Sequence, residues 1–352
     1  MLDSGTMADK GSVKGIKMKN DILLSGFMLS VSFSVVADPL STWNQTEPKQ
    51  ALMDWVDEVT TRGSDHFIPM EKRYVVFDND GTLWPESPVP FQVQFILDEI
   101  KRQAPQHPEW TYSPLLTAAI NDDYKTVAHY GDDGLNKLIA MTHSGITDTE
   151  YAQRVKSWLS KKKHPRFGCR YDHLAYQPMK QLLNYLQTNG FKTWIVSAGG
   201  IDFMRVMTKE MYGIPPEQVI GSFSISEYAL TPDGDKIIKT MKGPFTDNAV
   251  NKPAAIHLFM GHRPVAAFGN SDDDLSMLRY SSANPDYHTF SMLIRHTDNV
   301  REYQYEGHTF LNGNMNQALT SAKVKGWTIV DIKRDWNTVF DPAACPAPGN
   351  AK

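Results

Sequence analysis

Residues 74–82 read Tyr-Val-Val-Phe-Asp-Asn-Asp-Gly-Thr, an apolar run that leads into two aspartates and a Gly-Thr turn. The apolar run predicts a buried strand, and Asp78 and Asp80 lie at its end. Because alternate residues of an extended chain face the same side, both carboxylates can point into one site. Like charges this close repel each other, so we expect a cation, a lysine or a shared proton beside them.

This segment alone allows two interpretations. Asp, Asn, Gly and Thr are ordinary turn residues that follow strands in many proteins. Paired carboxylates at a strand end also suit phosphoryl chemistry, in which a carboxylate can act as a nucleophile. Segments further along the chain separate the two interpretations, because three more of them carry complementary groups.

Composition places the chain among globular proteins with a sizeable core, since 41% of its 352 residues are hydrophobic and 11% are aromatic. The formal net charge is -4, from 36 basic and 40 acidic residues. With no basic excess, we expect no nucleic-acid partner.

The first 37 residues differ in texture from the rest. Residues 1–17 are rich in Gly, Ser and Lys without periodicity, which is typical of a vector-derived or misassigned leader before Met18. An apolar run at 22–36 then ends before Ala37, and it is short for a membrane span. We interpret it as a signal peptide cleaved after Ala37, with an anchor or a buried helix as alternatives. The first interpretation predicts a periplasmic or secreted protein with no stable membrane span after cleavage.

Cys169 and Cys345 are the two cysteines of the chain, and their spacing is not that of a metal site. In an oxidising compartment they could form a disulfide that ties the C-terminal tail to the body. Free thiols are the alternative. Neither cysteine is a catalytic candidate.

Periodicity divides the chain after the leader. Residues 84–170 carry helix signals, such as apolar spacing at 93–100 and a capping box at Thr147 and Glu150. From residue 171 onward, strands and helices alternate, with strands expected at 192–196, 265–268, 288–294 and 327–331 and a hairpin from 219–225 and 236–240. We predict an α/β fold, a doubly wound Rossmann-like parallel sheet with an inserted α-helical cap. The expected parts are the leader and signal at 1–37, the core at 38–83 and 171–340, the cap at 84–170, and a loose tail at 341–352.

Ligands of such sheets bind at the carboxyl ends of the strands, so the residues there are the candidates for chemistry. Ser197-Ala198-Gly199-Gly200 follows a predicted strand, and its hydroxyl and backbone N–H groups can hold phosphoryl oxygens or simply cap a helix. Lys252 lies at the start of a predicted helix, where the helix dipole disfavours a cation. An anionic partner, such as Asp78 or a phosphate, would explain a lysine at this position. Lys242 is the rival lysine.

The turn at residues 269–275, Gly-Asn-Ser-Asp-Asp-Asp-Leu, is the second strong signal. It concentrates hard oxygen ligands after a buried strand, which suits Mg²⁺. An acidic turn that caps the following helix is the alternative interpretation. Together, the four segments favour a functional site over a chance combination of turn residues.

This ordered set resembles the haloacid dehalogenase superfamily of phosphohydrolases over about residues 70–300. The Asp-x-Asp-Gly-Thr element at 78–82, a serine after the second strand, a lysine at a helix start and the 269–275 turn match its four motifs. Because the helical insertion lies between the first two motifs, the subtype is similar to the phosphoserine-phosphatase-like branch.

The resemblance implies a role for each matched residue. Asp78 would be the nucleophile that forms an aspartyl-phosphate, and Asp80 would be the acid/base. The implied phosphate-binding residues are Thr82, Ser197, Gly199 and Lys252, and the implied Mg²⁺ site comprises Asp78, Asp80, Asn270 and Asp274.

One position departs from the pattern. Many relatives carry Asp where this chain has Asn270, so metal ligation can pass to the amide oxygen or to a neighbouring carboxylate. Asp272, Asp273 and Asp274 stay open as that carboxylate, and we favour Asp274.

The expected activity is Mg²⁺-dependent hydrolysis of a small phosphate monoester. Asp80 favours this over dehalogenation, because an alcohol leaving group needs a proton and a halide does not. A phosphotransferase and a catalytically idle relative that binds a phosphorylated ligand are the alternatives. Candidate substrate contacts are Trp84, Glu86, Phe91, His129, Tyr130, His143 and Arg205.

Overall fold

The structure is a computed structural model that describes residues 11, 15, 37–305 and 314–346. The predicted signal segment at 22–36, nearly all of the leader and the last six residues lie outside the described residues. The fold described below is that of the unit formed by residues 38–352.

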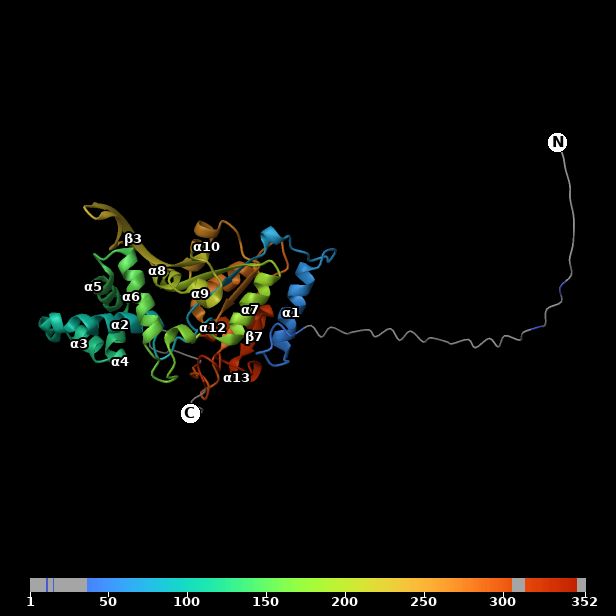
Figure 1. Ribbon diagram of the computed structural model, residues 1–352, viewed down its shortest axis with the longest axis horizontal. Helices are drawn as coiled ribbons and strands as arrows, with labels where there is room; N and C mark the ends of the chain where they lie inside the picture. The colour runs from blue at the N-terminus through green and yellow to red at the C-terminus, as the bar shows by residue number, and fades with distance from the viewer. Residues whose placement is uncertain (1–10, 12–14, 16–36, 306–313, 347–352) are drawn as a thin grey trace, which may run out of the picture. The chain divides into compact units, whose positions relative to one another are not determined.

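A sheet forms the centre of this unit (Figure 1). It has seven strands in the order β4-β3-β2-β1-β5-β6-β7. Neighbouring strands run parallel except β3 and β4, which are antiparallel. The predicted doubly wound α/β fold is confirmed, with an antiparallel strand at one edge. The strands are β1 (Tyr74–Phe77), β2 (Lys192–Gly200), β3 (Val219–Thr231), β4 (Gly234–Phe245), β5 (Ala266–Gly269), β6 (Phe290–Arg295) and β7 (Thr328–Asp331).

Strand β1 lies in the middle of the sheet, and its residues explain why. Val75 and Phe77 pack into one hydrophobic cluster while Val76 packs into another, and all three are fully buried. A strand buried on both faces reads as a continuous apolar run and belongs between two helical layers. The strand order reverses between β1 and its neighbours β2 and β5, so the loops that follow these three strands meet at one edge of the sheet.

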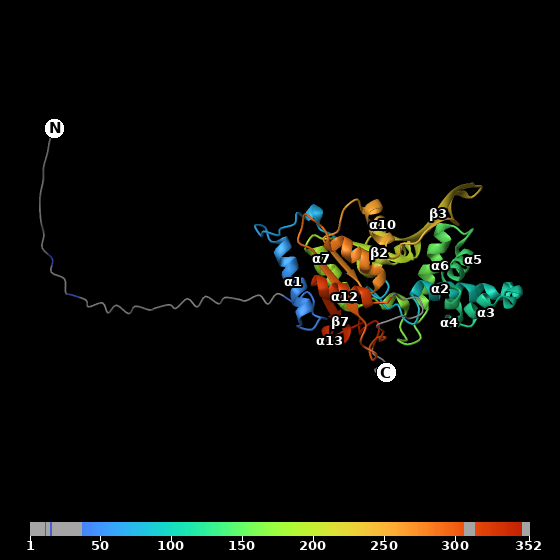
Figure 2. The same cartoon turned by 180° about the vertical axis from the view of Figure 1, so that it is seen from behind.

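Helices cover both faces of this sheet (Figure 2). The cluster that contains Val76 includes apolar residues of α10 and α11, whereas the cluster that contains Phe77 includes residues of α1 and α7. The core helices are α1 (Glu47–Thr60), α7 (Gln177–Thr188), α8 (Ile201–Arg205), α9 (Thr208–Tyr212), α10 (Asn251–Met260), α11 (Leu275–Ser282), α12 (Asn316–Lys325) and α13 (Ile332–Asp335).

The predicted helical insertion between β1 and β2 is present as a cap of five α-helices. The apolar spacing at residues 93–100 places one face of the first cap helix in the core, and Thr147 Oγ1 accepts a hydrogen bond from Glu150 N at 3.0 Å as the helix-start signal predicted. The cap helices are α2 (Phe91–Gln103), α3 (Pro114–Ile120), α4 (Tyr124–His129), α5 (Gly131–His143) and α6 (Asp148–Lys161).

The hairpin of β3 and β4 is longer than the sequence predicted, and it reaches the cap (Figure 1). Lys239 of β4 pairs with the loop between α5 and α6: Gly145 N donates to Lys239 O, and Lys239 N donates to Ile146 O, both at 2.9 Å. The apolar pattern of the sequence underestimates the length of the hairpin, because residues 225–230 are largely exposed and do not alternate between buried and exposed side chains. The cap is therefore attached to the core at a point far from its chain connections.

Cys169 and Cys345 form a disulfide with a Cα–Cα distance of 5.4 Å. It joins the segment after the cap to the end of the chain, and it decides between the paired and free states that the sequence left open. Within the described part of the chain, no helix is long and apolar enough to cross a membrane.

Candidate active site

The loop after β1 is a tight turn that fixes both aspartates. Leu83 N donates to Asn79 O at 2.8 Å, and Gly81 N donates to Trp84 O at 2.8 Å. Gly81 has a φ of +74°, and a Cβ there would lie 2.2 Å from Asn270 Nδ2. Only glycine satisfies both the left-handed backbone and the close approach, so the Asp-Gly-Thr sequence follows from the geometry of this turn.

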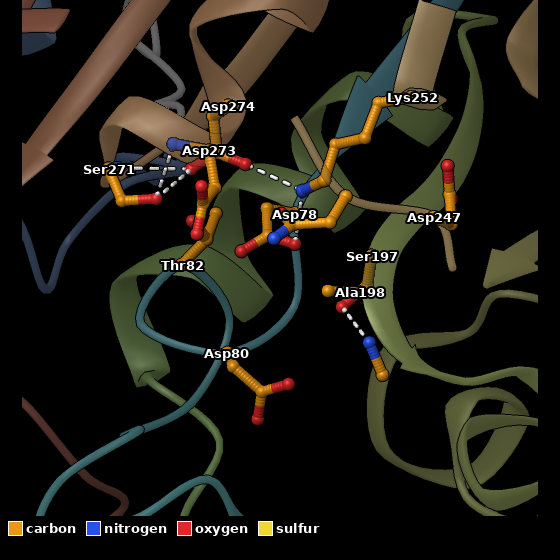
Figure 3. A network of polar contacts seen from close by, with 12 residues as sticks. Asp78, Asp80, Thr82, Ser197, Ala198, Asp247, Lys252, Ser271, Asp273 and Asp274 are labelled. Atoms are coloured by element: carbon orange, nitrogen blue, oxygen red, sulfur yellow. Dashed lines mark hydrogen bonds and ion pairs between the residues drawn. The ribbon is translucent and has the colours of Figure 1, made fainter. Parts of the chain in front are cut away.

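Asp78 contacts Lys252 at the floor of the site (Figure 3). Lys252 Nζ donates to Asp78 Oδ1 at 2.8 Å and to Asp274 Oδ1 at 2.7 Å, and the lysine side chain is only 2% exposed. Lys252 lies in the first turn of α10, where the sequence required an anionic partner. The rival Lys242 pairs with Glu227 on the exposed hairpin instead.

Electrostatics couple these three groups. Burial and the nearby Asp274 carboxylate raise the pKa of Asp78, and the contact with Lys252 opposes that rise. Burial disfavours the charge on Lys252, but its contacts with Asp274 and Asp78 outweigh burial and raise its pKa. Lys252 is therefore a permanent cation, while Asp78 needs further positive charge to be fully ionised.

Asp80 has a separate anchor. Trp84 Nε1 donates to Asp80 Oδ1 at 2.7 Å. Burial raises the pKa of Asp80 to about 6, and the hydrogen bond from Trp84 opposes the rise. A carboxyl that titrates near neutral pH can both give and take a proton, which is the requirement for a general acid/base.

The end of β2 faces Asp80. Ser197 Oγ accepts a hydrogen bond from Gly199 N at 3.2 Å, and both residues line the cleft described below. A Cβ at Gly199 would lie 3.5 Å from Asp80 Oδ2, so this backbone passes close to the acid/base candidate. The structure thus brings the predicted Ser197 and Gly199 to the same edge as Asp78, Asp80 and Lys252.

Thr82 and Asn270 are placed differently from the other predicted residues. Thr82 is fully buried, and its Oγ1 donates to Asn270 Oδ1 at 3.0 Å. Asn270 Nδ2 in turn donates to Glu86 Oε1 at 2.8 Å. Neither Thr82 nor Asn270 is among the residues that line the cleft, whereas Glu86 is.

The three aspartates of the 269–275 turn have three different surroundings. Asp274 is fully buried, and its Oδ2 accepts from Asn270 N at 2.8 Å and Ser271 N at 3.0 Å while its Oδ1 faces Lys252. Asp272 Oδ1 accepts from Ala318 N of α12 at 2.6 Å, and Asp273 lines the cleft. The part of Asp274 in a metal site stays a prediction.

Two buried groups beside the site have no signal in the sequence. His296 Nε2 lies 2.7 Å from Gly81 O, and its Nδ1 lies 3.1 Å from Glu302 Oε2, so the pair supports the turn from behind. Asp247 is fully buried, and among the described residues neither of its carboxylate oxygens has a hydrogen-bond partner. Burial raises the pKa of Asp247 to about 6. Partners distant in sequence, such as Gly81 and His296, cannot be paired by local patterns.

A cleft of about 300 Å³ opens above Asp78 and Asp80, between the sheet edge, the cap and the β3–β4 hairpin. Of the seven candidate substrate contacts, Glu86 and His143 line it. The others do not: Trp84 and Phe91 are packed in the core, and His129, Tyr130 and Arg205 lie outside its lining.

The distal wall of the cleft carries groups that the sequence did not single out. Lys239 of the hairpin forms an ion pair with Asp202 and lies 4.6 Å from the ring centroid of Tyr151. Tyr151 OH lies 3.0 Å from His143 Nε2. Burial and the nearby Lys239 lower the pKa of His143 to about 3, so this imidazole is neutral near pH 7.

The fold and this edge of the sheet define a hydrolase of the haloacid dehalogenase type. The chain matches the haloacid dehalogenase-like hydrolase family over residues 75–279, and it belongs to that family. The match begins in β1 and ends in α11, so it spans the four strand-end segments and the cap.

Several solved structures are similar to this chain at low sequence identity. A conserved protein of unknown function from Anaerococcus prevotii DSM 20548 has a TM-score of 0.52 and 14% identity, with 82% of this chain and 92% of that chain covered. A phosphoserine phosphohydrolase-like protein from Francisella tularensis subsp. tularensis SCHU S4 has a TM-score of 0.36 and 21% identity, with 63% and 87% covered. A substrate-bound phosphoserine phosphatase has a TM-score of 0.35 and 15% identity, with 63% and 86% covered. No curated protein matches the chain.

The family typically uses Mg²⁺, and the donor set at this edge suits that ion. Four carboxylates lie at the site, the buried ones of Asp78, Glu86 and Asp274 and the partly buried one of Asp80. Lys252 is a buried cation that contacts Asp78 and Asp274. Carboxylate oxygens are the ligands that Mg²⁺ prefers, and a divalent cation would favour the ionised form of Asp78. The residues present therefore fit the ion.

Proposed function

We propose that this protein is a Mg²⁺-dependent phosphatase that hydrolyses a small phosphate monoester through an aspartyl-phosphate on Asp78. One observation carries the proposal: Asp78 is held by Lys252 at the cleft floor, while Asp80 is held separately by Trp84. A nucleophile beside a fixed cation and a second carboxyl with a pKa near 6 are the two groups that the reaction needs.

In the first step an oxygen of Asp78 attacks the phosphorus. Oδ1 is engaged by Lys252, so Oδ2 is the candidate for attack. As the new P–O bond forms, the bond to the leaving alcohol oxygen breaks, and Asp80 donates its proton to that oxygen. The free alcohol departs and Asp80 becomes a carboxylate.

In the second step water attacks the phosphorus of the aspartyl-phosphate. Asp80 accepts a proton from the water, the P–O bond to Asp78 breaks, and inorganic phosphate leaves. Both carboxyl groups then return to their starting states. The same group acts as acid and then as base, and a pKa near neutral pH permits both roles.

Charge stabilisation comes from several sources. Lys252 faces the phosphoryl group from one side, and the hydroxyl of Ser197 and the backbone of Gly199 face it from another. Mg²⁺, when bound, would supply positive charge that stabilises the negative charge of the phosphoryl group. We assign Asp78 and Asp80 to the Mg²⁺ site. Asn270 and Asp274 are the other ligands that the sequence predicts, but Thr82 donates to the amide oxygen of Asn270, and Lys252 and backbone N–H groups engage both oxygens of Asp274. Thr82 acts through Asn270, because its hydroxyl does not reach the cleft.

The cleft supports a small substrate. Its volume of about 300 Å³ is at the lower end of ligand pockets. Its distal wall combines the Lys239–Asp202 ion pair with apolar cap residues such as Val93, Ile96 and Leu135. This wall suits an alcohol that has both an apolar part and a polar group.

We also propose that the protein works in the periplasm or outside the cell. The apolar segment at 22–36 and the disulfide between Cys169 and Cys345 support export, because disulfides persist in oxidising compartments. Mass spectrometry of the protein from its host should give an N-terminus at Asp38 in an extracytoplasmic fraction. Recovery with residues 22–36 intact from the cytoplasm would contradict this.

The test of the activity is hydrolysis of p-nitrophenyl phosphate by the mature chain. We expect turnover with Mg²⁺, loss with a chelator, and loss of at least about 10³-fold in Asp78→Asn, because the amide is not a nucleophile. Asp233→Asn is the matched control, since that aspartate is exposed in the hairpin turn. Full activity in Asp78→Asn would refute the assignment of the nucleophile.

Added alcohols distinguish the alternatives. A phosphotransferase would transfer the phosphoryl group to glycerol or ethanol and yield less inorganic phosphate than free alcohol. A catalytically idle relative would be stabilised thermally by phosphorylated ligands and turn over none of a broad panel.

A further inference from the structure

We propose that Glu86 is a ligand of the Mg²⁺ site and supplies the carboxylate that the side chain at position 270 lacks. This inference rests on the proposed Mg²⁺-dependent function. It assigns a metal-binding role to a residue whose sequence context suggested only a substrate contact.

Glu86 is in the right place for this role. It follows the turn that carries Asp78 and Asp80, is only 6% exposed, and lines the cleft together with both aspartates. One of its carboxylate oxygens, Oε1, accepts from Asn270 Nδ2 at 2.8 Å. Tyr305 also contacts this carboxylate, and its hydrogen bond favours the ionised form that would bind a cation in the cleft.

Asn270 is arranged to hold Glu86 and not to bind a metal. Its Oδ1, the only side-chain atom that could ligate Mg²⁺, accepts the hydroxyl hydrogen of Thr82, and its Nδ2 points at Glu86. Asn270 does not line the cleft. The chain Thr82–Asn270–Glu86 therefore resembles the support that orients a metal-binding carboxylate from behind.

The turn at 269–275 offers few other carboxylates. Both oxygens of Asp274 are engaged, by Lys252 and by backbone N–H groups, and Asp272 is bound to α12. Asp273 is the one aspartate of that turn that lines the cleft, so it is the rival ligand.

Packing holds the Glu86–Asn270 pair in place. A Cβ at Gly81 would lie 2.2 Å from Asn270 Nδ2 and 2.7 Å from Glu86 Oε1. The pair is thus pressed against the turn that carries the nucleophile. A carboxylate buried in this position repels Asp78, Asp80 and Asp274, and a divalent cation relieves that repulsion.

The test measures Mg²⁺ binding directly, by isothermal titration calorimetry and by the Mg²⁺-induced shift in melting temperature. Glu86→Gln is the decisive variant, because its Oε1 can still accept from Asn270 Nδ2 while the charge is lost. We expect the Kd for Mg²⁺ to rise at least tenfold. In the double variant Glu86→Gln with Asn270→Asp, the glutamine can donate to the new carboxylate, but we expect Mg²⁺ affinity to stay low, because the side chain at position 270 does not line the cleft.

Asp273→Asn is the matched control, and we expect its Kd to change less than that of Glu86→Gln. Melting in chelator confirms that each variant is folded. Unchanged Mg²⁺ affinity in folded Glu86→Gln would overturn the proposal, and so would a larger loss in Asp273→Asn. If the wild-type protein binds Mg²⁺ but hydrolyses no phosphate ester, the proposed function fails while the role of Glu86 is still decided by these titrations.

Discussion

Replacement of Trp84 by phenylalanine should move the pH dependence of the reaction. Trp84 Nε1 donates to Asp80 Oδ1 at 2.7 Å in a buried environment. This hydrogen bond favours the ionised carboxylate, so its loss favours the protonated acid and raises the pKa of Asp80. Because the protonated form is the one that serves the leaving group, the variant should keep its general acid at higher pH than the wild type.

The size of the shift follows from the strength of the bond. A hydrogen bond to a charged group contributes about 1.5–3 kcal/mol, and one pKa unit corresponds to about 1.4 kcal/mol. The pKa of Asp80, raised by burial to about 6, should therefore rise by about 1–2 further units in Trp84→Phe. The alkaline limb of kcat/KM should move up by the same amount.

The assay needs a substrate whose leaving group requires the proton. Phenyl phosphate serves, because a phenol has a pKa of about 10 and leaves poorly as an anion. Release of inorganic phosphate is followed from about pH 4.5 to 9 for both proteins. The ionisation of the substrate itself affects both profiles equally and drops out of the comparison.

Trp55→Phe is the matched control. Trp55 Nε1 donates to His288 O at 3.2 Å, away from the site, so this variant loses a tryptophan and a hydrogen bond but leaves Asp80 untouched. Its alkaline limb should coincide with that of the wild type. If Trp84→Phe lowers kcat/KM equally at every pH, Trp84 acts by packing alone and the assignment of Asp80 as the acid loses its support.

Three further predictions concern stability. Lys252→Met leaves two buried carboxylates without their cation, so it should lower the free energy of unfolding by about 3–5 kcal/mol at pH 7 and by less at pH 5, as measured by chemical denaturation. Cys345→Ser removes the disulfide that closes a loop of 176 residues, so it should lower the free energy of unfolding by about 2–5 kcal/mol. Reductant should destabilise the wild type by the same amount and leave the variant unchanged. A variant as stable as the oxidised wild type would contradict this. Asp247→Asn removes a carboxyl whose pKa is raised to about 6 by burial. This group stabilises the fold at low pH and loses that contribution as pH rises through 6, so the variant should gain about 2 kcal/mol of stability relative to the wild type between pH 4 and pH 7. Parallel stability profiles of the two proteins would refute this.

The sequence predicted the sheet and the helical insertion because these depend on local patterns. The apolar run of β1, the strand-end serine and Lys252 are each short segments whose position in a parallel sheet fixes where they meet. The extent of the hairpin was underestimated, because its outer part is exposed and has no apolar alternation.

The contacts around the proposed metal site join residues far apart in the sequence, and no local pattern encodes them. Thr82 has a partner 188 residues away, and Glu86 a partner 184 residues away. Asp272, Asp273 and Asp274 are equivalent in sequence, yet one helical turn sends them to α12, to the cleft and to Lys252. Their different surroundings follow from the rotation of successive side chains around that turn, which a run of identical residues conceals.

Because the β3–β4 hairpin is attached to the cap, the residues that can change substrate selectivity are separate from the residues proposed for catalysis. The groups proposed for chemistry lie on the sheet edge, whereas the walls that meet the alcohol come from two insertions at different places in the chain. The cap helices and residues 222–245 can vary in length and sequence more freely than the turn after β1, which is held by Trp84 and Glu86. Changes in either insertion can therefore admit new substrates. Replacing the hairpin by that of another protein should change substrate selectivity and leave the proposed catalytic pair, Asp78 and Asp80, in place.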